Sequence, residues 1–186
     1  FSELMGHEEM LADRRLVPDE WINNVHSSGR HLLGLINDVL DLAKVEAGRI
    51  DLRLEPLDVG AAVAEAVAPL GPLVAAKQLR LTLAAPPERV TADRLRLRQM
   101  LNNLLSNAIK FTPDEGAIYV SAHRDGAFTH LSVADTGPGI EPAEQARVFE
   151  EFHQAGDAAS RAAGTGLGLA LTRRLAEAHH GRVELW

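Results

Sequence analysis

Three polar residues in one short stretch have the types and the spacing of a ligand site. Asn103, Asn107 and Lys110 stand at i, i+4 and i+7, so on a helix they share one face. Leucine and alanine residues of the same stretch fall on the opposite face, which can pack against a core. Carboxamide oxygens suit Mg2+, and a lysine ammonium is a point charge for phosphate. The stretch therefore predicts a nucleotide triphosphate site.

Two glycine-rich turns follow this stretch. In D-T-G-P-G-I, Asp135 closes an expected strand, and Gly137 and Gly139 let the backbone approach a ligand closely. The Asp135 carboxylate could accept the exocyclic amine of adenine, or it could simply cap a plain turn. In G-T-G-L-G-L-A-L, residues 164–171 begin a helix whose free N–H groups favour an anion. A loop hinge with a packing glycine is the alternative for the second turn.

Composition excludes several classes of function. The chain has 186 residues, 46% of them hydrophobic, with a net charge of −7, which fits an ordinary chain of one or two domains. No basic patch favours nucleic acid. The chain has no cysteine, so it has no thiolate chemistry, and a cytoplasmic location is compatible with that. We expect no apolar run near the roughly 20 residues of a membrane span, although the full-length protein could be membrane-anchored.

A long helix is predicted over about residues 18–47. Its apolar face is too wide for a lone surface helix and suits a helical bundle. A partner helix from a second protomer is the favoured interpretation, and a hairpin packed on its own domain is the alternative. The positions that recur at steps of three and four are Ile22, Val25, Gly29, Leu32, Ile36, Val39, Ala43 and Glu46.

The remaining chain alternates helices and strands, which predicts an α/β sandwich with a mixed sheet. Asp93 is expected to cap the helix of the asparagines, and Asp125-Gly126 predicts a hairpin. The segment 153–163 is small, polar and aperiodic, which predicts a loop. The expected order is an extended linker at 52–58, a helix at 59–74, a strand at 79–83, the asparagine helix, strands at 118–122 and 128–133, helices at 142–148 and 166–180, and a strand at 182–186.

The order of four motifs is far more specific than any one of them. The motifs are N-x-x-x-N-x-x-K, D-x-G-x-G, V-F-E-E-F at 148–152 and G-T-G-L-G-L. In this order and spacing the chain resembles the dimerisation and catalytic region of bacterial two-component sensor histidine kinases. These belong to the wider GHKL or Bergerat ATPase group, together with Hsp90, gyrase and MutL. The resemblance covers essentially the whole chain.

The resemblance implies an α+β fold class with a defined domain order. A helical hairpin would form a four-helix bundle in the dimer, followed by an α/β sandwich of the GHKL type with a mixed sheet. Residues 1–50 would be the dimerisation and histidine phosphotransfer region, 51–57 a linker, and 58–186 the catalytic ATP-binding domain. The last strand of that domain is expected beyond Trp186.

The resemblance also implies roles for individual residues. Asn107 would bind Mg2+, with Asn103 as a second candidate ligand. Asn107, Lys110 and Arg147 would be the catalytic residues, with Arg147 placed to reach the γ-phosphate. The implied nucleotide-binding positions are Asn103, Asn107, Lys110, Phe111, Asp135, Gly137, Gly139, Ile140, Phe149, Phe152, Gly164, Thr165, Gly166, Leu167 and Gly168.

The phosphoacceptor histidine of the resembled family is expected upstream of Phe1. His7 is followed by Glu8 but lacks the Thr-Pro of the family pattern, so we predict no phosphoacceptor in this sequence. The expected function is transfer of the γ-phosphoryl of Mg-ATP to that histidine, for relay to an aspartate of a response regulator receiver domain. Expected partners are a second copy, through the 18–47 helix, and the regulator. A degenerate kinase acting as an ATP-binding scaffold and another GHKL-type ATPase are the alternatives.

Overall fold

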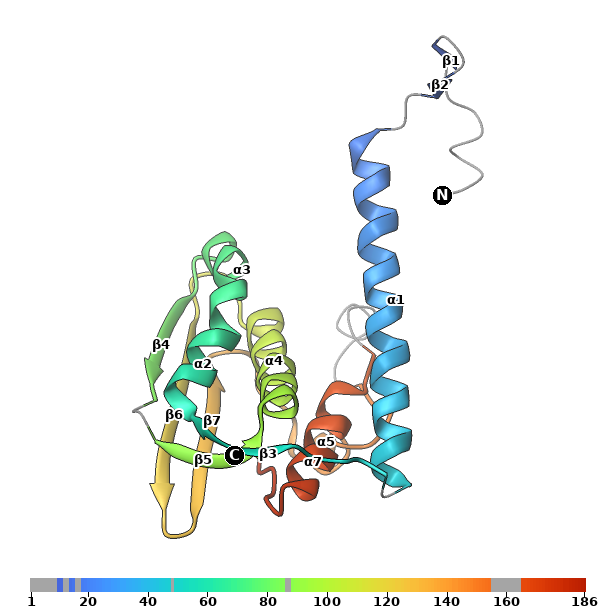
Figure 1. Ribbon diagram of the computed structural model, residues 1–186. Helices are drawn as coiled ribbons and strands as arrows, with labels where there is room; N and C mark the ends of the chain where they lie inside the picture. The colour runs from blue at the N-terminus through green and yellow to red at the C-terminus, as the bar shows by residue number, and fades with distance from the viewer. Residues whose placement is uncertain (1–9, 12–13, 16–17, 48, 86–87, 155–164) are drawn as a thin grey trace. The chain divides into compact units, whose positions relative to one another are not determined.

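The computed structural model describes residues 10–11, 14–15, 18–47, 49–85, 88–154 and 165–186 (Figure 1). The chain divides into two compact units, Phe1–Leu40 and Asp41–Trp186. The predicted loop at 153–163 falls mostly on residues outside the described part. The division into residues 1–50, 51–57 and 58–186 stays a prediction.

The first unit contains a short antiparallel ladder and most of one long helix. Strands β1 (Met10–Leu11) and β2 (Arg14–Arg15) pair with each other, and helix α1 runs over Asp19–Glu46. Acidic residues in the first turn of α1 suit the positive end of its dipole. The helix predicted over 18–47 is confirmed.

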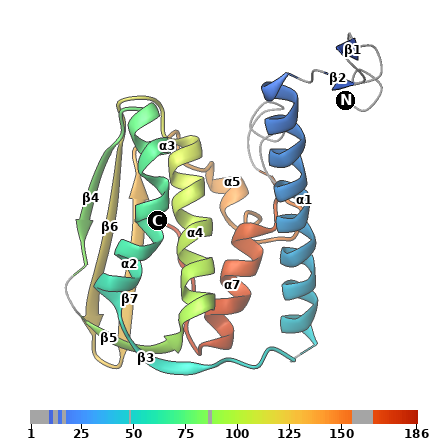
Figure 2. The same ribbon diagram turned by 45° about the horizontal axis from the view of Figure 1, so that its top comes forward.

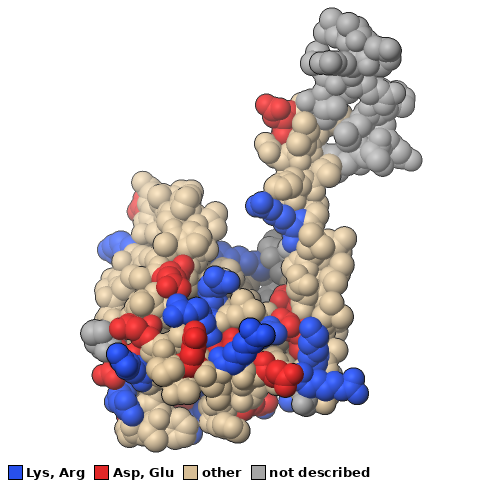
Figure 3. All heavy atoms as spheres, in the orientation of Figure 1, with Lys and Arg blue, Asp and Glu red and all other residues tan. Residues whose placement is uncertain are grey.

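Much of the apolar face of α1 is open to solvent. Figure 3 shows few charged side chains along the part of α1 that belongs to the first unit. No described residue of the first unit covers this part of the face. Its members, between 44% and 62% exposed, are Ile22, Val25, Leu32, Leu33, Ile36, Val39 and Leu40.

The second unit is built on a three-stranded mixed sheet in the order β4-β6-β7. Strand β4 (Arg80–Ala84) is parallel to β6 (Ala117–Asp125), and β6 is antiparallel to β7 (Phe128–Asp135). The turn between β6 and β7 places Gly126 at φ 58°, a conformation that glycine adopts without strain. The predicted Asp-Gly hairpin is confirmed.

Helices cover one face of this sheet (Figure 2). Helix α2 (Val59–Val67) continues through a 3-10 turn, η2 (Ala68–Leu70), into α3 (Gly71–Ala76). Prolines at 69 and 72 interrupt it because they lack an N–H donor. The other helices are α4 (Arg94–Phe111), α5 (Pro142–Gln145) and α7 (Gly168–Ala178).

The core lies between α2, α4 and the sheet. Burying each large aliphatic side chain contributes roughly 1.5–3 kcal/mol. Residues Val59–Ala76 are apolar enough over 18 residues to pass as a membrane span by length and composition, against the expectation that no such run exists. In this fold they form α2, η2 and α3, and three side chains of α2 belong to the core cluster. Its buried members are Val59, Val63, Ala66, Leu79, Leu101, Leu105, Ala108, Ile109, Ile118, Val120 and Ala122.

Two sequence predictions about strands were wrong. Residues 54–58, expected as an extended linker, form strand β3 (Leu54–Asp58), which pairs antiparallel with the unpredicted β5 (Arg89–Asp93). Strand β5 has too few apolar residues to show the alternation from which a strand is predicted. Residues 182–186, expected as a strand, have no regular structure. A strand needs a hydrogen-bonded neighbour, and among the described residues none pairs with this segment.

Candidate functional site

Helix α4 carries the predicted polar face in the expected way. Asp93 caps it, accepting the backbone N–H of Arg96 at 3.0 Å. Leucine and alanine side chains bury one face of the helix in the core. Asn103, Asn107 and Lys110 are half-buried, so they lie neither in packed hydrocarbon nor fully in water. The three side chains stay accessible to a ligand while their backbone is held rigidly.

Asn103 joins α4 to the start of α7. Its Nδ2 donates to the carbonyl of Gly168 at 3.1 Å and to Oγ1 of Thr172 at 3.4 Å. The Thr172 hydroxyl donates in turn to Gly168 O at 2.8 Å and is buried. Two motifs 65 residues apart therefore meet. Thr172 was missed by the sequence reasoning, although its position one turn after Gly168 was a usable signal.

The side chains of Asn107 and Lys110 differ from Asn103 in making no hydrogen bond or ion pair with another described residue. Among the described residues, no hydrogen bond engages the Asn107 carboxamide, and no carboxylate pairs with the Lys110 ammonium. Lys110 Nζ lies 4.3 Å from the centroid of the Phe111 ring. Desolvation by burial lowers the pKa of Lys110 below its ordinary value of 10.5. A partly desolvated cation without an anion is suited to bind one.

The turn after β7 lies against the C-terminal end of α4. Asp135 is exposed, and its Oδ1 accepts the N–H of Gly137 at 2.8 Å. A Cβ at Gly137 would lie 2.6 Å from Asp135 Oδ1 and 3.1 Å from Phe111 O, so a larger residue would displace the Asp135 carboxylate and press on the end of α4. Gly139 has φ 72°, where other residues are strained. Ile140, half-buried, accepts Gln145 Nε2 through its carbonyl at 3.0 Å.

The V-F-E-E-F segment meets the second glycine turn through the main chain. The N–H of Phe152 donates to Gly166 O at 3.1 Å, and a Cβ at Gly166 would lie 2.6 Å from the Phe152 carbonyl carbon. The Phe152 side chain itself is 67% exposed, while Phe149 is half-buried. The two motifs therefore meet through backbone atoms rather than through a buried Phe152 ring.

The remaining site predictions lie around this junction. Leu167 is buried, and its N–H donates to Thr165 Oγ1 at 3.2 Å. Arg147 is on the surface, where it pairs with Glu144 at 3.5 Å and Glu150 at 3.6 Å. Gly164 lies outside the described residues.

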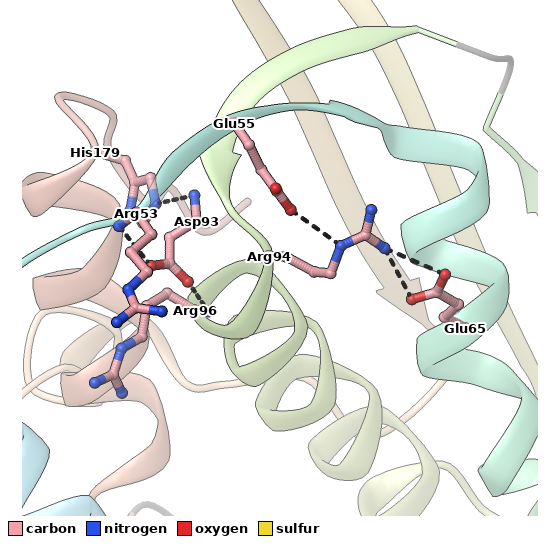
Figure 4. Close-up of polar contacts among 7 residues, drawn as sticks. All are labelled: Arg53, Glu55, Glu65, Asp93, Arg94, Arg96 and His179. Atoms are coloured by element: carbon pink, nitrogen blue, oxygen red, sulfur yellow. Dashed lines mark hydrogen bonds and ion pairs between the residues drawn. The ribbon is translucent and has the colours of Figure 1, made fainter.

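Sequence reasoning missed a polar cluster at the N-terminal end of α4 (Figure 4). Asp93 Oδ2 accepts the N–H of Arg53 at 2.8 Å, and the N–H of Asp93 donates to His179 Nε2 at 3.0 Å. His179 Nδ1 donates to Leu175 O at 2.7 Å, which fixes the ring tautomer. The cluster joins the start of α4 to β3 and to the end of α7. Only Asp93 had a sequence signal, as a helix cap.

A buried ion pair extends this cluster to the last turns of α1. Arg96 Nη1 lies 2.6 Å from Asp41 Oδ2, and the two side chains are 17% and 14% exposed. Gln99 Nε2 also donates to Asp41 Oδ2 at 3.1 Å. Burial raises the pKa of Asp41, but the hydrogen bonds from Arg96 and Gln99 and the charges of Arg96 and Lys44 outweigh it, so the pKa is lowered.

The elements that carry the predicted site match a known family. Residues 92–185 match the family model described as "Histidine kinase-, DNA gyrase B-, and HSP90-like ATPase". The chain belongs to this ATPase family. The match confirms the resemblance drawn from the four motifs, and the mixed sheet with its helices confirms the predicted α+β fold class of the GHKL type.

Relatives of this ATPase-family chain include named histidine kinases. "Histidine protein kinase DivJ" of Caulobacter vibrioides is 42% identical over 189 residues, covering 98% of this chain and 32% of DivJ. "Circadian input-output histidine kinase CikA" of Synechococcus elongatus is 41% identical over 173 residues, covering 89% of this chain and 23% of CikA. The chain thus spans about a third or less of the length of these curated relatives.

A solved structure shares both the sequence pattern and the fold. The crystal structure of full-length ShkA in complex with AMPPNP has a TM-score of 0.74 and 36% sequence identity to this chain. The match covers 94% of this chain and 36% of ShkA. The similarity therefore extends beyond the residues that the family model covers.

Proposed function

We propose that this chain binds Mg-ATP and transfers the γ-phosphoryl group to a histidine on a dimerisation helix, for relay to a response regulator aspartate. The observation that carries the proposal is the pair Asn107 and Lys110, whose side-chain polar groups make no hydrogen bond or ion pair with any described residue, while a packed helix fixes their backbone. The names of DivJ and CikA and the nucleotide analogue in the ShkA structure support the same reaction class.

Each residue would contribute positioning or charge. Lys110 would hold phosphate oxygens, and Asp135 would accept a hydrogen bond from the adenine amino group. Asn107 would bind the magnesium ion through its carboxamide oxygen, and Asn103 keeps its own oxygen available because its Nδ2 makes the contacts to α7. Bound magnesium supplies charge neutralisation of the phosphates. Arg147 would need to leave Glu144 and Glu150 to reach a γ-phosphate.

The residues present fit such a ligand. Magnesium is usually held by one or two protein oxygens together with substrate phosphates and water rather than by a complete protein cage. The described residues contain no group of three or more His, Cys, Asp or Glu side chains that could hold a metal by themselves. The carboxamide oxygens of Asn107 and Asn103, together with the phosphates of a bound nucleotide, would supply ligands of this kind.

Dimerisation through α1 is part of the proposal. The exposed apolar face of α1 would pack against the same face of α1 in a second protomer, as in a helical bundle. The family resemblance is the basis for proposing a phosphoacceptor histidine and a response regulator partner. It is also the basis for proposing a cytoplasmic location for this chain.

The test is autophosphorylation of a chain extended upstream of Phe1 through the expected histidine. Incubation with Mg-ATP should produce an acid-labile phosphate on that histidine, and Asn107→Ala should abolish it without unfolding the chain. Nucleotide binding without any phosphoenzyme would favour the scaffold alternative. Steady ATP hydrolysis without a phosphoenzyme would favour another GHKL-type ATPase.

A further inference from the structure

Lys77 makes an unusual set of contacts at the C-terminal end of α4. It follows α3, is half-buried, and its Nζ donates to three main-chain carbonyls. These are the carbonyls of Ile109 at 2.9 Å, Lys110 at 3.0 Å and Thr112 at 2.8 Å. All three ammonium donors are therefore used on one short segment more than 30 residues away.

The carbonyls that Lys77 binds are those that a helix cannot satisfy by itself. The last four C=O groups of a helix have no intrahelical partner, and a cation is favoured there by the helix dipole. Helix α4 ends at Phe111, so Ile109 and Lys110 belong to this unsatisfied turn. Lys77 closes the turn from outside the helix, and one of the carbonyls that it binds is that of Lys110.

The same turn contacts the loop of Asp135. Phe111 O is the atom that would lie 3.1 Å from a Cβ at Gly137. Thr136, between Asp135 and Gly137, accepts the N–H of Ala117 through Oγ1 at 2.9 Å and donates its own N–H to Ala117 O at 3.0 Å. Any shift of the end of α4 would therefore change the distance between Lys110 and Asp135.

We propose that Lys77 is a positioning residue for the nucleotide. By holding the last turn of α4, it fixes the separation between the phosphate-binding ammonium of Lys110 and the adenine-binding carboxylate of Asp135. This inference rests on the proposed function. Lys77 lies upstream of residues 92–185, which the family model covers, so it is not one of the motif residues that identified the site.

The experiment compares Lys77→Met with the unaltered 186-residue chain. Methionine keeps an unbranched apolar side chain but has no donor. We expect the Kd for Mg-ATP to rise about tenfold, the lower end of the cost of losing an outer-shell partner at a metal site. Adenosine occupies one end of the site only, so its Kd should change less than about twofold. Both are measured by calorimetry far below the unfolding midpoint.

Val59→Ala is the matched control, because Val59 is buried in the core at the start of α2. It should lower the unfolding midpoint without weakening Mg-ATP binding by the folded chain. Lys77→Gln keeps a neutral donor and should fall between the wild type and Lys77→Met; it carries the test alone if the Met variant does not fold.

The inference is wrong if the Lys77 variants bind Mg-ATP as tightly as the wild type, or lose adenosine and Mg-ATP affinity equally. It is also wrong if Val59→Ala, at equal loss of stability, loses the same affinity. Failure of the Mg-ATP site on which this inference rests would instead be visible in the wild-type chain, which would then bind no nucleotide.

Discussion

The two ends of helix α4 treat their polar groups in opposite ways. At the N-terminal end, Asp93 and Arg96 make hydrogen bonds or ion pairs to β3, α7 and the last turns of α1. Towards the C-terminal end, the Asn107 carboxamide and the Lys110 ammonium make no hydrogen bond or ion pair within the described part of the chain, although Lys77 holds the backbone carbonyl of Lys110. Polar groups satisfied within the protein stabilise the fold, whereas those left unsatisfied on a rigid element are available to a ligand.

The sharpest test of this contrast is Asn107→Ala. We expect loss of Mg-ATP affinity by about 100-fold, as for removal of a metal ligand or its close partner. The free energy of unfolding should change by less than about 0.5 kcal/mol, because no side-chain hydrogen bond to a described residue is lost. Asn102→Ala is the matched control, since Asn102 is exposed on the neighbouring position. Equal effects of the two variants on binding would contradict the assignment of Asn107.

Asp41→Ala should show the reverse pattern. It leaves Arg96 half-satisfied in a site where both side chains are largely buried, so we expect a loss of about 2–3 kcal/mol in the free energy of unfolding. Mg-ATP affinity of the folded chain should be retained. Denaturant unfolding measures the loss, and Asp51→Ala, at an exposed position, provides the control. A neutral outcome for Asp41→Ala would mean that the ion pair does not stabilise the unit.

Low pH should destabilise the fold through Asp93, at the N-terminal end of α4. Burial raises the pKa of Asp93, but backbone N–H groups of Arg96, Arg53 and Leu95 and the charge of Arg96 outweigh it, so the pKa lies below its ordinary value of 3.8. The ionised cap therefore contributes stability above the unfolded pKa, and this contribution is lost as the pH falls through the folded pKa.

Asp93→Asn removes the titrating carboxylate but keeps one side-chain oxygen that can cap the helix. Its amide nitrogen cannot accept the second N–H, from Arg53 or Arg96, so the two proteins are compared by the slopes of their pH profiles rather than by their midpoints. Between about pH 5 and about pH 3, the unfolding midpoint of the variant should fall less steeply than that of the wild type. Parallel pH profiles for the two proteins would show that Asp93 does not contribute to acid unfolding.

The smallest effect is expected at Arg94, next to Arg96 in sequence. Arg94 pairs with Glu55 at 3.2 Å and Glu65 at 3.4 Å, but all three side chains are more than half exposed. Exposed ion pairs contribute little, so Arg94→Ala should change the free energy of unfolding by less than about 0.5 kcal/mol. If Arg94→Ala lowered the free energy of unfolding as much as Asp41→Ala, burial would not explain why the ion pair of Arg96 stabilises the fold more than those of Arg94.

The predictions from sequence succeeded where the signal was local. The period of α1, the Asp93 cap and the Asp125-Gly126 hairpin each depend on a few neighbouring residues, and each is present. The shared face of Asn103, Asn107 and Lys110 follows from helical geometry alone. Strand β5 and the pairing of Leu54–Asp58 were missed because their partners lie far away in the chain.

The sequence by itself determined the family, the α+β class and the residue types at the site, because motif order and helical period need no knowledge of contacts. The tertiary structure decided which of those residues have protein partners. Asn103 contacts α7, His179 receives the N–H of Asp93, and Lys77 closes the end of α4, all across 32 or more residues of sequence. Such pairings depend on how packed elements bring distant backbone groups together, and no local pattern encodes them.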